Sequence, residues 1–159
     1  MKQRYLVAIL LFVAILIIDQ YVKMLFVNGL EYEGECLSFV LAYNYGVAFS
    51  MFAFLAEYLK YIQIALLLGG AIYLLLNKSV LNYYLLPVAL LYAGGIGNII
   101  DRFVHGAVVD YVYWHCGFEF AIFNLADVII DLAVVLIIWF QFKSSKKEKA
   151  EKNNTHLGS

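Results

Sequence analysis

Long apolar runs, interrupted by a few polar positions, dominate the pattern of this chain. Four of the runs approach the roughly 20 residues that a helix needs to cross a bilayer. They cover residues 5–26, 58–76, 83–100 and 120–142. The pattern therefore predicts an integral membrane protein that is mainly α-helical, with four transmembrane helices.

The composition points to the same class. Hydrophobic residues make up 64% of the 159 positions and charged residues only 14%, and the mean hydropathy is +0.81. A soluble domain has roughly 45–50% apolar and about 25% charged residues, so the composition excludes that class. We expect one transmembrane domain over residues 1–142, followed by a flexible, basic cytoplasmic tail over 143–159 that can touch anionic lipid.

The first apolar run follows Lys2 and Arg4, as the apolar core of a signal peptide would. However, no small-residue cleavage site comes after it, and Asp19 and Lys23 continue its helical pattern. The sequence therefore predicts a retained transmembrane helix.

Basic residues predict the orientation. Lys2 and Arg4 precede the first run, Lys78 lies between the second and the third, and lysines follow the fourth. The positive-inside rule then places both termini in the cytoplasm and the loops 27–57 and 101–119 on the outer side. The longest basic run lies in the polar tail, so the sequence gives little support for nucleic-acid binding.

The outer loops are unusually apolar. Residues 36–49 and 107–114 are rich in Val, Phe, Tyr and Ala, yet they are too short to span a bilayer. Strand-like segments lying on the membrane surface explain them best. We therefore expect a small, strand-rich outer region next to the helices.

Cysteine and histidine positions give no metal signature. Cys36 and Cys116 lie in different outer loops, where oxidising conditions permit a disulfide, but the sequence does not determine whether they pair. His105 and His115 stand alone, and no CxxC or HExxH motif is present. The sequence therefore calls for no metal.

Several polar residues recur with helical spacing inside the apolar runs. Asp19 and Lys23 are four residues apart and can form an ion pair, although a role facing a substrate stays open. Gly94, Asn98 and Arg102 share one helix face. The glycine favours close helix packing, whereas a buried amide or guanidinium needs partners.

One more acid accompanies that third run, and further acids mark the start of the fourth. Asp101, next to the shared face, reads as a simple surface acid. Asn124 is a candidate N-cap with Asp127 as its acidic companion in the first turn. Asp131 lies one turn deeper and needs a neutralising partner or a proton, and its role stays open. Asp110 ends the strand-like second loop at the same outer boundary.

Two carboxylates brought to one boundary from different elements suggest an aspartic dyad. Like charges at short range cannot both ionise easily, so Asp110 and Asp127 would share a proton. One acid then activates water and the other protonates a leaving amine. The positive end of the helix dipole favours Asp127 as the base. Unrelated structural acids remain the alternative.

Two functions of other classes compete with this interpretation. In a small transporter or proton-relay protein, Asp19, Arg102, Asp127 and Asp131 would form the relay. Such proteins usually show inverted repeats and broken helices, which this sequence lacks. A non-catalytic scaffold that uses the glycines as contact faces leaves the acids unexplained.

The chain also resembles a known family, the lipoprotein signal peptidases (signal peptidase II or prolipoprotein signal peptidase), which are aspartic endopeptidases of bacterial membranes. Five stretches match in the family's order: Asp19-Gln-Tyr-Val-Lys23, Asn44-Tyr-Gly-Val-Ala-Phe49, Gly94-Gly-Ile-Gly-Asn98-Ile-Ile-Asp-Arg102, Val108-Val-Asp110-Tyr and Phe123-Asn-Leu-Ala-Asp127. One departure is a pair of small residues shifted by one position, at Ala93 to Gly95.

The resemblance implies a function and a set of site residues. Asp110 and Asp127 would be the catalytic pair. Residues that bind substrate or support the site would be Asp19, Lys23, Asn44, Gly46, Gly94, Asn98, Arg102, Asn124 and Ala126. The substrate would be a diacylglyceryl-modified prolipoprotein, cleaved just before its lipidated Cys. The resemblance also implies the bacterial inner membrane, a site near its outer face, inhibition by globomycin-type peptides, and no cofactor.

Overall fold

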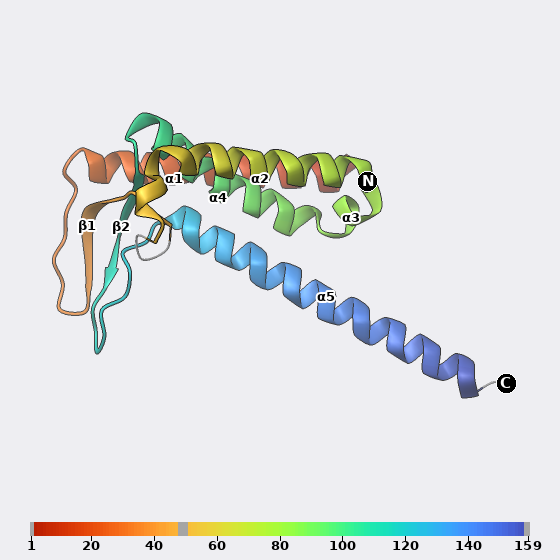
Figure 1. Ribbon diagram of the computed structural model, residues 1–159. Coiled ribbons are helices and arrows are strands. Elements are labelled where there is room, and N and C mark those ends of the chain that lie inside the picture. The colour runs from red at the N-terminus through yellow and green to blue at the C-terminus, as the bar shows by residue number, and fades with distance from the viewer. Residues whose placement is uncertain (1, 48–50, 158–159) are drawn as a thin grey trace.

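The computed structural model describes residues 2–47 and 51–157 as a mainly helical protein with one small sheet (Figure 1). The helices are α1 (Lys2–Val27), the short 3-10 helix η2 (Ala53–Leu55), α2 (Ala56–Leu76), α3 (Lys78–Tyr83), α4 (Leu85–Val104) and α5 (Leu125–Leu157), and the strands are β1 (Leu37–Asn44) and β2 (Val108–Trp114). Each apolar run of the sequence thus forms a helix, and both apolar loops contribute a strand.

Among the described residues, three helices are long and apolar enough to cross a membrane: Lys2–Val27, Ala53–Leu76 and Leu125–Lys146. The prediction of four is therefore confirmed for three. The remaining predicted run, residues 83–100, forms α4, which extends past its expected end at residue 100. Asn98, Asp101 and Arg102 near its C-terminus lower its mean hydropathy, since they are polar or charged, and all three are buried.

The helices are apolar on the outside and polar where they meet. On α1, Leu6 and Ile9 are more than half exposed, whereas Asp19 and Lys23 are buried. This is the reverse of a soluble protein and suits a lipid environment, in which exposed aliphatic side chains cost nothing and buried polar groups must find partners.

Helix α4 is the central element, in contact with α1, α2 and α5. Glycines allow this close packing. A Cβ atom on Gly94 would lie 2.6 Å from the carbonyl oxygen of Ala126, and one on Gly97 would lie 2.6 Å from Oδ2 of Asp19. The interpretation of Gly94 as a packing residue is thus confirmed, since any larger side chain would push α4 away from α5.

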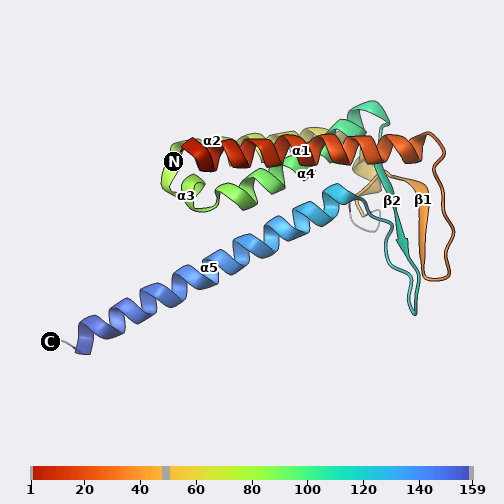
Figure 2. The same ribbon diagram turned by 180° about the vertical axis from the view of Figure 1, so that it is seen from behind.

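Strands β1 and β2 pair as an antiparallel sheet across one end of the helices (Figures 1 and 2). Ala42 lies opposite Asp110, and Asn44 lies opposite Val108. The ring of Phe26 from α1 stacks on Tyr111 with 4.3 Å between the ring centroids, which joins helix and sheet. Residues 48–49 of the predicted strand-like segment lie outside the described residues.

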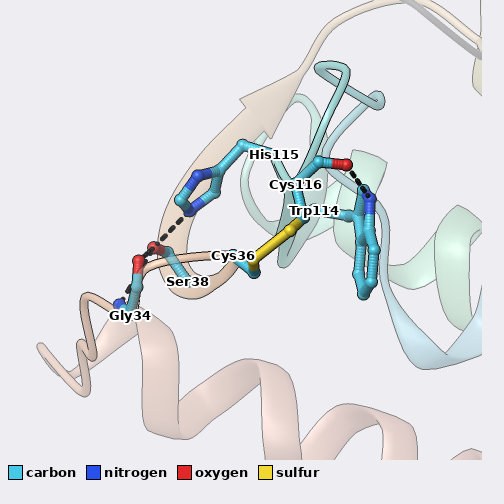
Figure 3. Close-up of a disulfide and its surroundings, with 6 residues drawn as sticks. All are labelled: Gly34, Cys36, Ser38, Trp114, His115 and Cys116. Carbon is cyan, nitrogen blue, oxygen red and sulfur yellow. Dashed lines mark hydrogen bonds between the residues drawn. A yellow bond between two sulfur atoms is a disulfide. The ribbon is translucent and has the colours of Figure 1, made fainter.

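A disulfide closes the far end of the sheet (Figure 3). It joins Cys36, just before β1, to Cys116, just after β2, across a sequence separation of 80 residues. Nearby, the hydroxyl group of Ser38 and Nε2 of His115 are 2.9 Å apart. The pairing that the sequence left open is therefore decided by the strand register.

Helix α5 leaves the other helices at an angle toward its C-terminus (Figure 2). It continues to Leu157 and so includes most of the tail predicted over residues 143–159. Its first turn, which packs against α4, is the part that concerns the site described below.

Candidate active site

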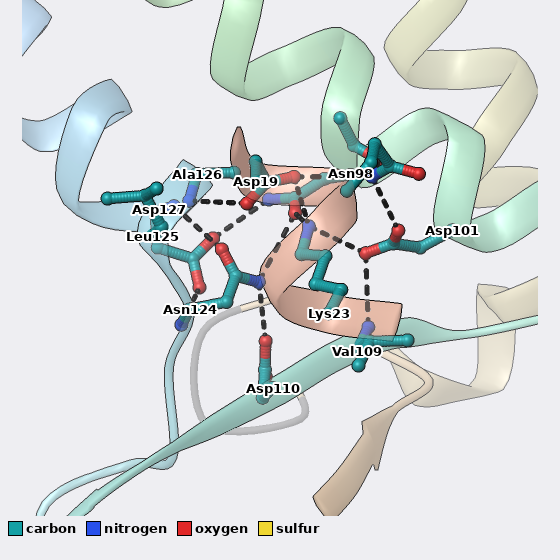
Figure 4. Close-up of polar contacts among 12 residues, drawn as sticks. Asp19, Lys23, Asn98, Asp101, Val109, Asp110, Asn124, Leu125, Ala126 and Asp127 are labelled. Carbon is teal, nitrogen blue, oxygen red and sulfur yellow. Dashed lines mark hydrogen bonds and ion pairs between the residues drawn. The ribbon is translucent and has the colours of Figure 1, made fainter. Parts of the chain in front are cut away.

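A cluster of buried polar side chains lies where α1, α4, the start of α5 and β2 meet (Figure 4). Its buried members are Asp19, Lys23, Asn98, Asp101, Arg102, Asp110 and Asn124. A buried polar group costs free energy unless it is hydrogen-bonded, and a buried charge costs more. The contacts of each group therefore show what the protein gains from it.

Asp110 lies in the middle of β2 and is only 2% exposed. Its Oδ2 accepts a hydrogen bond from the Asn44 side chain at 3.1 Å, and its Oδ1 accepts one from the Asn124 side chain at 2.7 Å. Burial, followed by the negative charge of Asp127, raises the pKa of Asp110 to about 7, although the two amides and Lys23 partly oppose this. Near neutral pH, Asp110 can therefore hold a proton.

Asp127 lies in the first turn of α5 and is half-buried. Its Oδ1 accepts a hydrogen bond from the Asn98 side chain at 2.8 Å, and its Oδ2 accepts one from the backbone N–H of Asn124 at 3.2 Å. The backbone N–H of Asp127 donates to Oδ1 of Asn124 at 2.9 Å. This reciprocal pair confirms Asn124 as the N-cap with Asp127 as its acidic companion.

Asn124 therefore links the two carboxylates. Its side-chain amide group donates to Asp110 at 2.7 Å and to Oδ1 of Asn98 at 3.2 Å, while its backbone and its own Oδ1 hold Asp127. Because the backbone N–H of Asp127 can only donate, the oxygen of the Asn124 side chain must face it, which determines the orientation of the amide. One side chain thus sets the relative position of a strand acid and a helix acid.

Lys23 forms the predicted ion pair and a second one that was not predicted. Its Nζ lies 2.9 Å from Oδ2 of Asp19 and 2.7 Å from Oδ2 of Asp101, and it donates to Oδ1 of Asn98 at 2.9 Å. The interpretation of Asp101 as a surface acid was wrong, since it is 2% exposed and also accepts the N–H of Val109 at 3.2 Å. The last turn of α4 packs against β2, which turns this acid inward.

Sequence reasoning also missed Gln20. Its amide group donates to Oδ2 of Asp19 at 3.2 Å, to the carbonyl of Gly97 at 3.3 Å and to Oδ1 of Asp101 at 3.0 Å. The available signal was an amide beside Asp19 within an apolar run. The other oxygen of Asp19 accepts the N–H of Ala126 at 3.0 Å, so α1 also holds the first turn of α5.

Tyr111, next to Asp110, is a second missed residue. It is 5% exposed, and its hydroxyl oxygen accepts the backbone N–H of Leu125 at 3.1 Å. Burial raises the pKa of Tyr111 to about 12, although the hydrogen bond from Leu125 lowers it slightly. The phenol therefore stays protonated and anchors β2 to the start of α5.

Arg102 holds the chain that follows β1. Its guanidinium group donates to the carbonyl of Gly46, whose own N–H donates to Oδ1 of Asn44 at 3.0 Å. Because the Asn44 side-chain amide also donates to Asp110, the chain that follows β1 is connected to the carboxylate pair through Asn44. Arg102 and Asn98 thus have the partners that the sequence required of them.

A cavity of about 270 Å³ opens beside the cluster. It is lined by residues of β1, α2, α4, α5 and the segment before α5, with Asn98, Arg102 and Asp127 among them. Asp110 lies behind this lining, and Asn44, which does line the cavity, donates to its carboxylate. The cavity wall thus presents Asp127 together with the side-chain amides of Asn44 and Asn98.

The structure brings nearly all predicted site residues together. Hydrogen bonds or ion pairs connect Asp19, Lys23, Asn44, Gly46, Asn98, Arg102, Asn124 and Ala126 to the network around Asp110 and Asp127. Gly94 contributes through packing instead. Asp131 is exposed and lines the cavity. In the described part of the chain, no three His, Cys, Asp or Glu residues gather as a metal site would require.

Comparison with known proteins gives a uniform result. The family model described as signal peptidase (SPase) II matches residues 11–143. A lipoprotein signal peptidase of Wolinella succinogenes is 54% identical over 136 residues, covering 86% of this chain and 93% of the relative. One of Helicobacter pylori is 44% identical over 147 residues, covering 92% of this chain and 94% of the relative. A solved bacterial membrane enzyme superposes with a TM-score of 0.77 at 27% identity, covering 89% of this chain and 90% of the other.

Proposed function

This chain belongs to the signal peptidase II family, and from that premise we propose that Asp110 and Asp127 are its catalytic pair. Its relatives are lipoprotein signal peptidases, so the chain is a membrane protease that removes signal peptides from prolipoproteins. The transporter alternative has no support among these comparisons. The proposal concerns the aspartic chemistry, the residues that perform it and the form of the substrate.

The observation that carries the assignment is the Asn124 link. Asn124 holds both carboxylates, Asp110 through its side-chain amide and Asp127 through its backbone N–H. Each carboxylate also accepts a hydrogen bond from a further side-chain amide, Asp110 from Asn44 and Asp127 from Asn98. Two acids in such a setting share one proton, because both cannot ionise at low cost. The raised pKa of Asp110 supports a resting state in which Asp110 is protonated and Asp127 is ionised.

The reaction then balances with no other group. The Asp127 carboxylate takes a proton from water, and the water oxygen attacks the carbonyl carbon of the scissile peptide bond. The carbon–nitrogen bond breaks, and Asp110 gives its proton to the leaving amine nitrogen. The pair ends with its single proton on Asp127 instead of Asp110. Transfer of that proton between the acids restores the starting state, and no metal or organic cofactor is needed.

Asn98 and Lys23 support the ionised form of Asp127. Asn98 donates to Asp127 at 2.8 Å while its own oxygen accepts from the Lys23 ammonium group at 2.9 Å. The cation thereby polarises the amide that binds the base. The start of α5 adds the positive end of its helix dipole at the same carboxylate.

The position of the site supports a lipid-anchored substrate. We propose that the substrate carries a diacylglyceryl-modified Cys and is cleaved just before that residue. The sheet lies at one end of the helices, and the N-terminus and α3 lie at the opposite end (Figure 1). The disulfide belongs to the sheet end, whereas Lys2 and Arg4 begin α1 and Lys78 begins α3. A disulfide fits the oxidising outer side and the basic residues fit the cytoplasm. We therefore propose that α4 also spans the inner membrane, with both termini cytoplasmic and the site near the outer face.

The test is a cleavage assay with the purified full chain in lipid and a diacylglyceryl-modified prolipoprotein. We expect Asp110→Asn and Asp127→Asn each to reduce kcat by roughly a thousandfold or more while the thermal unfolding midpoint changes little. The control is Glu119→Gln, which makes the same change at an exposed outer acid. Cleavage that persists in either aspartate variant would rule out the dyad.

Two additions test the class of chemistry. A globomycin-type peptide should inhibit the wild-type chain, and a metal chelator should leave its activity unchanged. Strong inhibition by the chelator would contradict the proposed mechanism and direct attention to His105 and His115.

A further inference from the structure

Gln63 has a feature that the catalytic network does not explain. It lies on α2, and its side chain lines the same cavity as Asp127. Its Oε1 atom is buried and has no hydrogen-bond partner in the part of the chain that the structure describes. Nearly all buried polar atoms in native proteins are paired, so an unpaired one needs an explanation, and a ligand is one.

Asp131, which lies on a different helix, shows a related feature. It lies on α5, one turn beyond Asp127, and lines the cavity. No hydrogen bond or ion pair joins its carboxylate to the described residues. An acidic side chain in a membrane helix is costly and usually has a partner. The Asp131 carboxylate is therefore available to accept a hydrogen bond from a ligand. Two elements thus present unpaired acceptors to one space.

The chemistry of the substrate supplies matching donors. A peptide bond can reach a catalytic pair only if the chain around it is extended, because a helix encloses its own backbone. Extension releases backbone N–H groups from their helical partners, and little water is available at membrane depth to replace them. A protease in a membrane therefore needs acceptors beside its catalytic groups.

We propose that Gln63 and Asp131 form a substrate subsite that accepts backbone N–H groups of the extended segment on the signal-peptide side of the scissile bond. This inference rests on the proposed function. The amide of Gln63 approaches from α2 and the carboxylate of Asp131 from α5, so the peptide is held between two walls. They are positioning residues, while Asp110 and Asp127 perform the bond chemistry.

The first experiment separates binding from chemistry. Steady-state cleavage of a diacylglyceryl-modified lipopeptide should give a KM about fivefold to tenfold higher for Gln63→Leu and for Asp131→Leu, with kcat within about twofold of the wild type. Gln63→Glu and Asp131→Asn keep an acceptor oxygen and should retain most of the wild-type KM. A merely structural role would not be rescued in this way.

A matched control removes the same group elsewhere. Gln141→Leu makes the same change on α5, where the Gln141 side chain is exposed and accepts a hydrogen bond from the Tyr84 hydroxyl group at 2.7 Å. Its KM should equal that of the wild-type chain. An equal rise in KM for this control would show a general effect of apolar substitutions and would overturn the proposal.

The second experiment identifies the donor. A series of lipopeptides has one backbone N–H at a time replaced by an ester oxygen, at positions before the scissile bond. For one position, we expect the ester to raise the KM of the wild-type chain but to have no further effect on Gln63→Leu, because the bond is already lost. Esters that act independently of Gln63 and Asp131 at every position would refute the subsite.

These experiments distinguish a failure of the subsite from a failure of the proposed function. If the wild-type chain cleaves the lipopeptide and the Leu variants keep its KM, the subsite falls and the proposed function stands. If the wild-type chain does not cleave it at all, the proposed function falls and the subsite falls with it.

Discussion

Two groups of buried acids lie side by side in this protein and are stabilised in opposite ways. The lysine cluster consists of Asp19, Lys23 and Asp101, in which one ammonium group contacts both carboxylates within 3 Å. The carboxylate pair, Asp110 and Asp127, is held by amides, and no ion pair joins it to the residues that the structure describes. Asn98 connects the two groups, since it accepts from Lys23 and donates to Asp127.

A buried acid in contact with a cation serves the structure, whereas a buried acid held by neutral amides is suited to reactivity. A cation in direct contact fixes an acid in its ionised form, and removing either partner leaves a buried charge. Neutral amides orient an acid and favour its charged form less strongly than burial opposes it, so the pKa of Asp110 rises to about 7 and Asp110 can exchange a proton with its neighbour.

Replacing the shared cation should have the largest effect. Lys23→Met leaves Asp19 and Asp101 buried without a counter-ion, so we expect the free energy of unfolding to fall by about 3–5 kcal/mol and activity to be lost. Thermal unfolding in detergent measures this. The control Lys78→Met removes an exposed lysine on α3 and should change little. A Lys23→Met variant as stable as the control would break the distinction between the two groups.

Raising the pH should affect the carboxylate pair specifically. The pKa of Asp110 is raised to about 7, so its proton is present below this value and is lost as the pH rises through it. Above about pH 7, kcat should fall about tenfold per pH unit, since the acid that serves the leaving amine is gone. Activity should return when the pH is lowered again. A kcat that stays constant up to pH 9 would argue against Asp110 as the acid.

The same group makes a contribution to stability with a defined sign. Its pKa in the folded chain lies above the value of about 3.9 for an unperturbed Asp. Its contribution to stability is therefore fully present below about pH 4 and is lost as the pH rises toward 7. Asp110→Asn, which cannot ionise, should lack this component of the pH dependence.

Changing the link between the acids should have an intermediate effect. Asn124→Ala removes the N-cap of α5 and a donor to Asp110, so we expect a loss of about 1 kcal/mol in stability and a decrease of about tenfold to a hundredfold in kcat. Asn124→Ser keeps a capping oxygen but lacks the amide that donates to Asp110, so it should restore stability more than activity. Equal recovery of both would mean that the cap alone matters.

Opening the disulfide should have the smallest effect on catalysis. Cys36 and Cys116 lie next to the Leu37–Trp114 pair, at the far end of the sheet from the Ala42–Asp110 pair. We expect kcat of the double variant Cys36→Ser, Cys116→Ser to stay within about twofold of the wild type. A large decrease would show that the covalent link, and not the strand register alone, positions Asp110.

Local pattern was a sound guide to the elements and to much of the site. Helical spacing correctly paired Asp19 with Lys23 and capped α5 with Asn124, because both contacts span only three or four residues. Packing over longer distances was invisible. Asp101 looked like a surface acid because its partners come from α1 and β2, and Gln20 was overlooked for the same reason.

The amino-acid sequence was enough to predict the membrane class, the helical segments, the strand-like loops and the candidate acids. Apolar runs of bilayer length, i to i+4 spacing and turn chemistry act within short stretches of chain. Which polar groups meet depends instead on contacts between distant segments. Asp19 accepts a hydrogen bond from the N–H of Ala126 across 107 residues. The strand register brings Cys36 to Cys116 and places Asp110 opposite Ala42. Such contacts depend on how α4 packs between its neighbours, which no local pattern encodes.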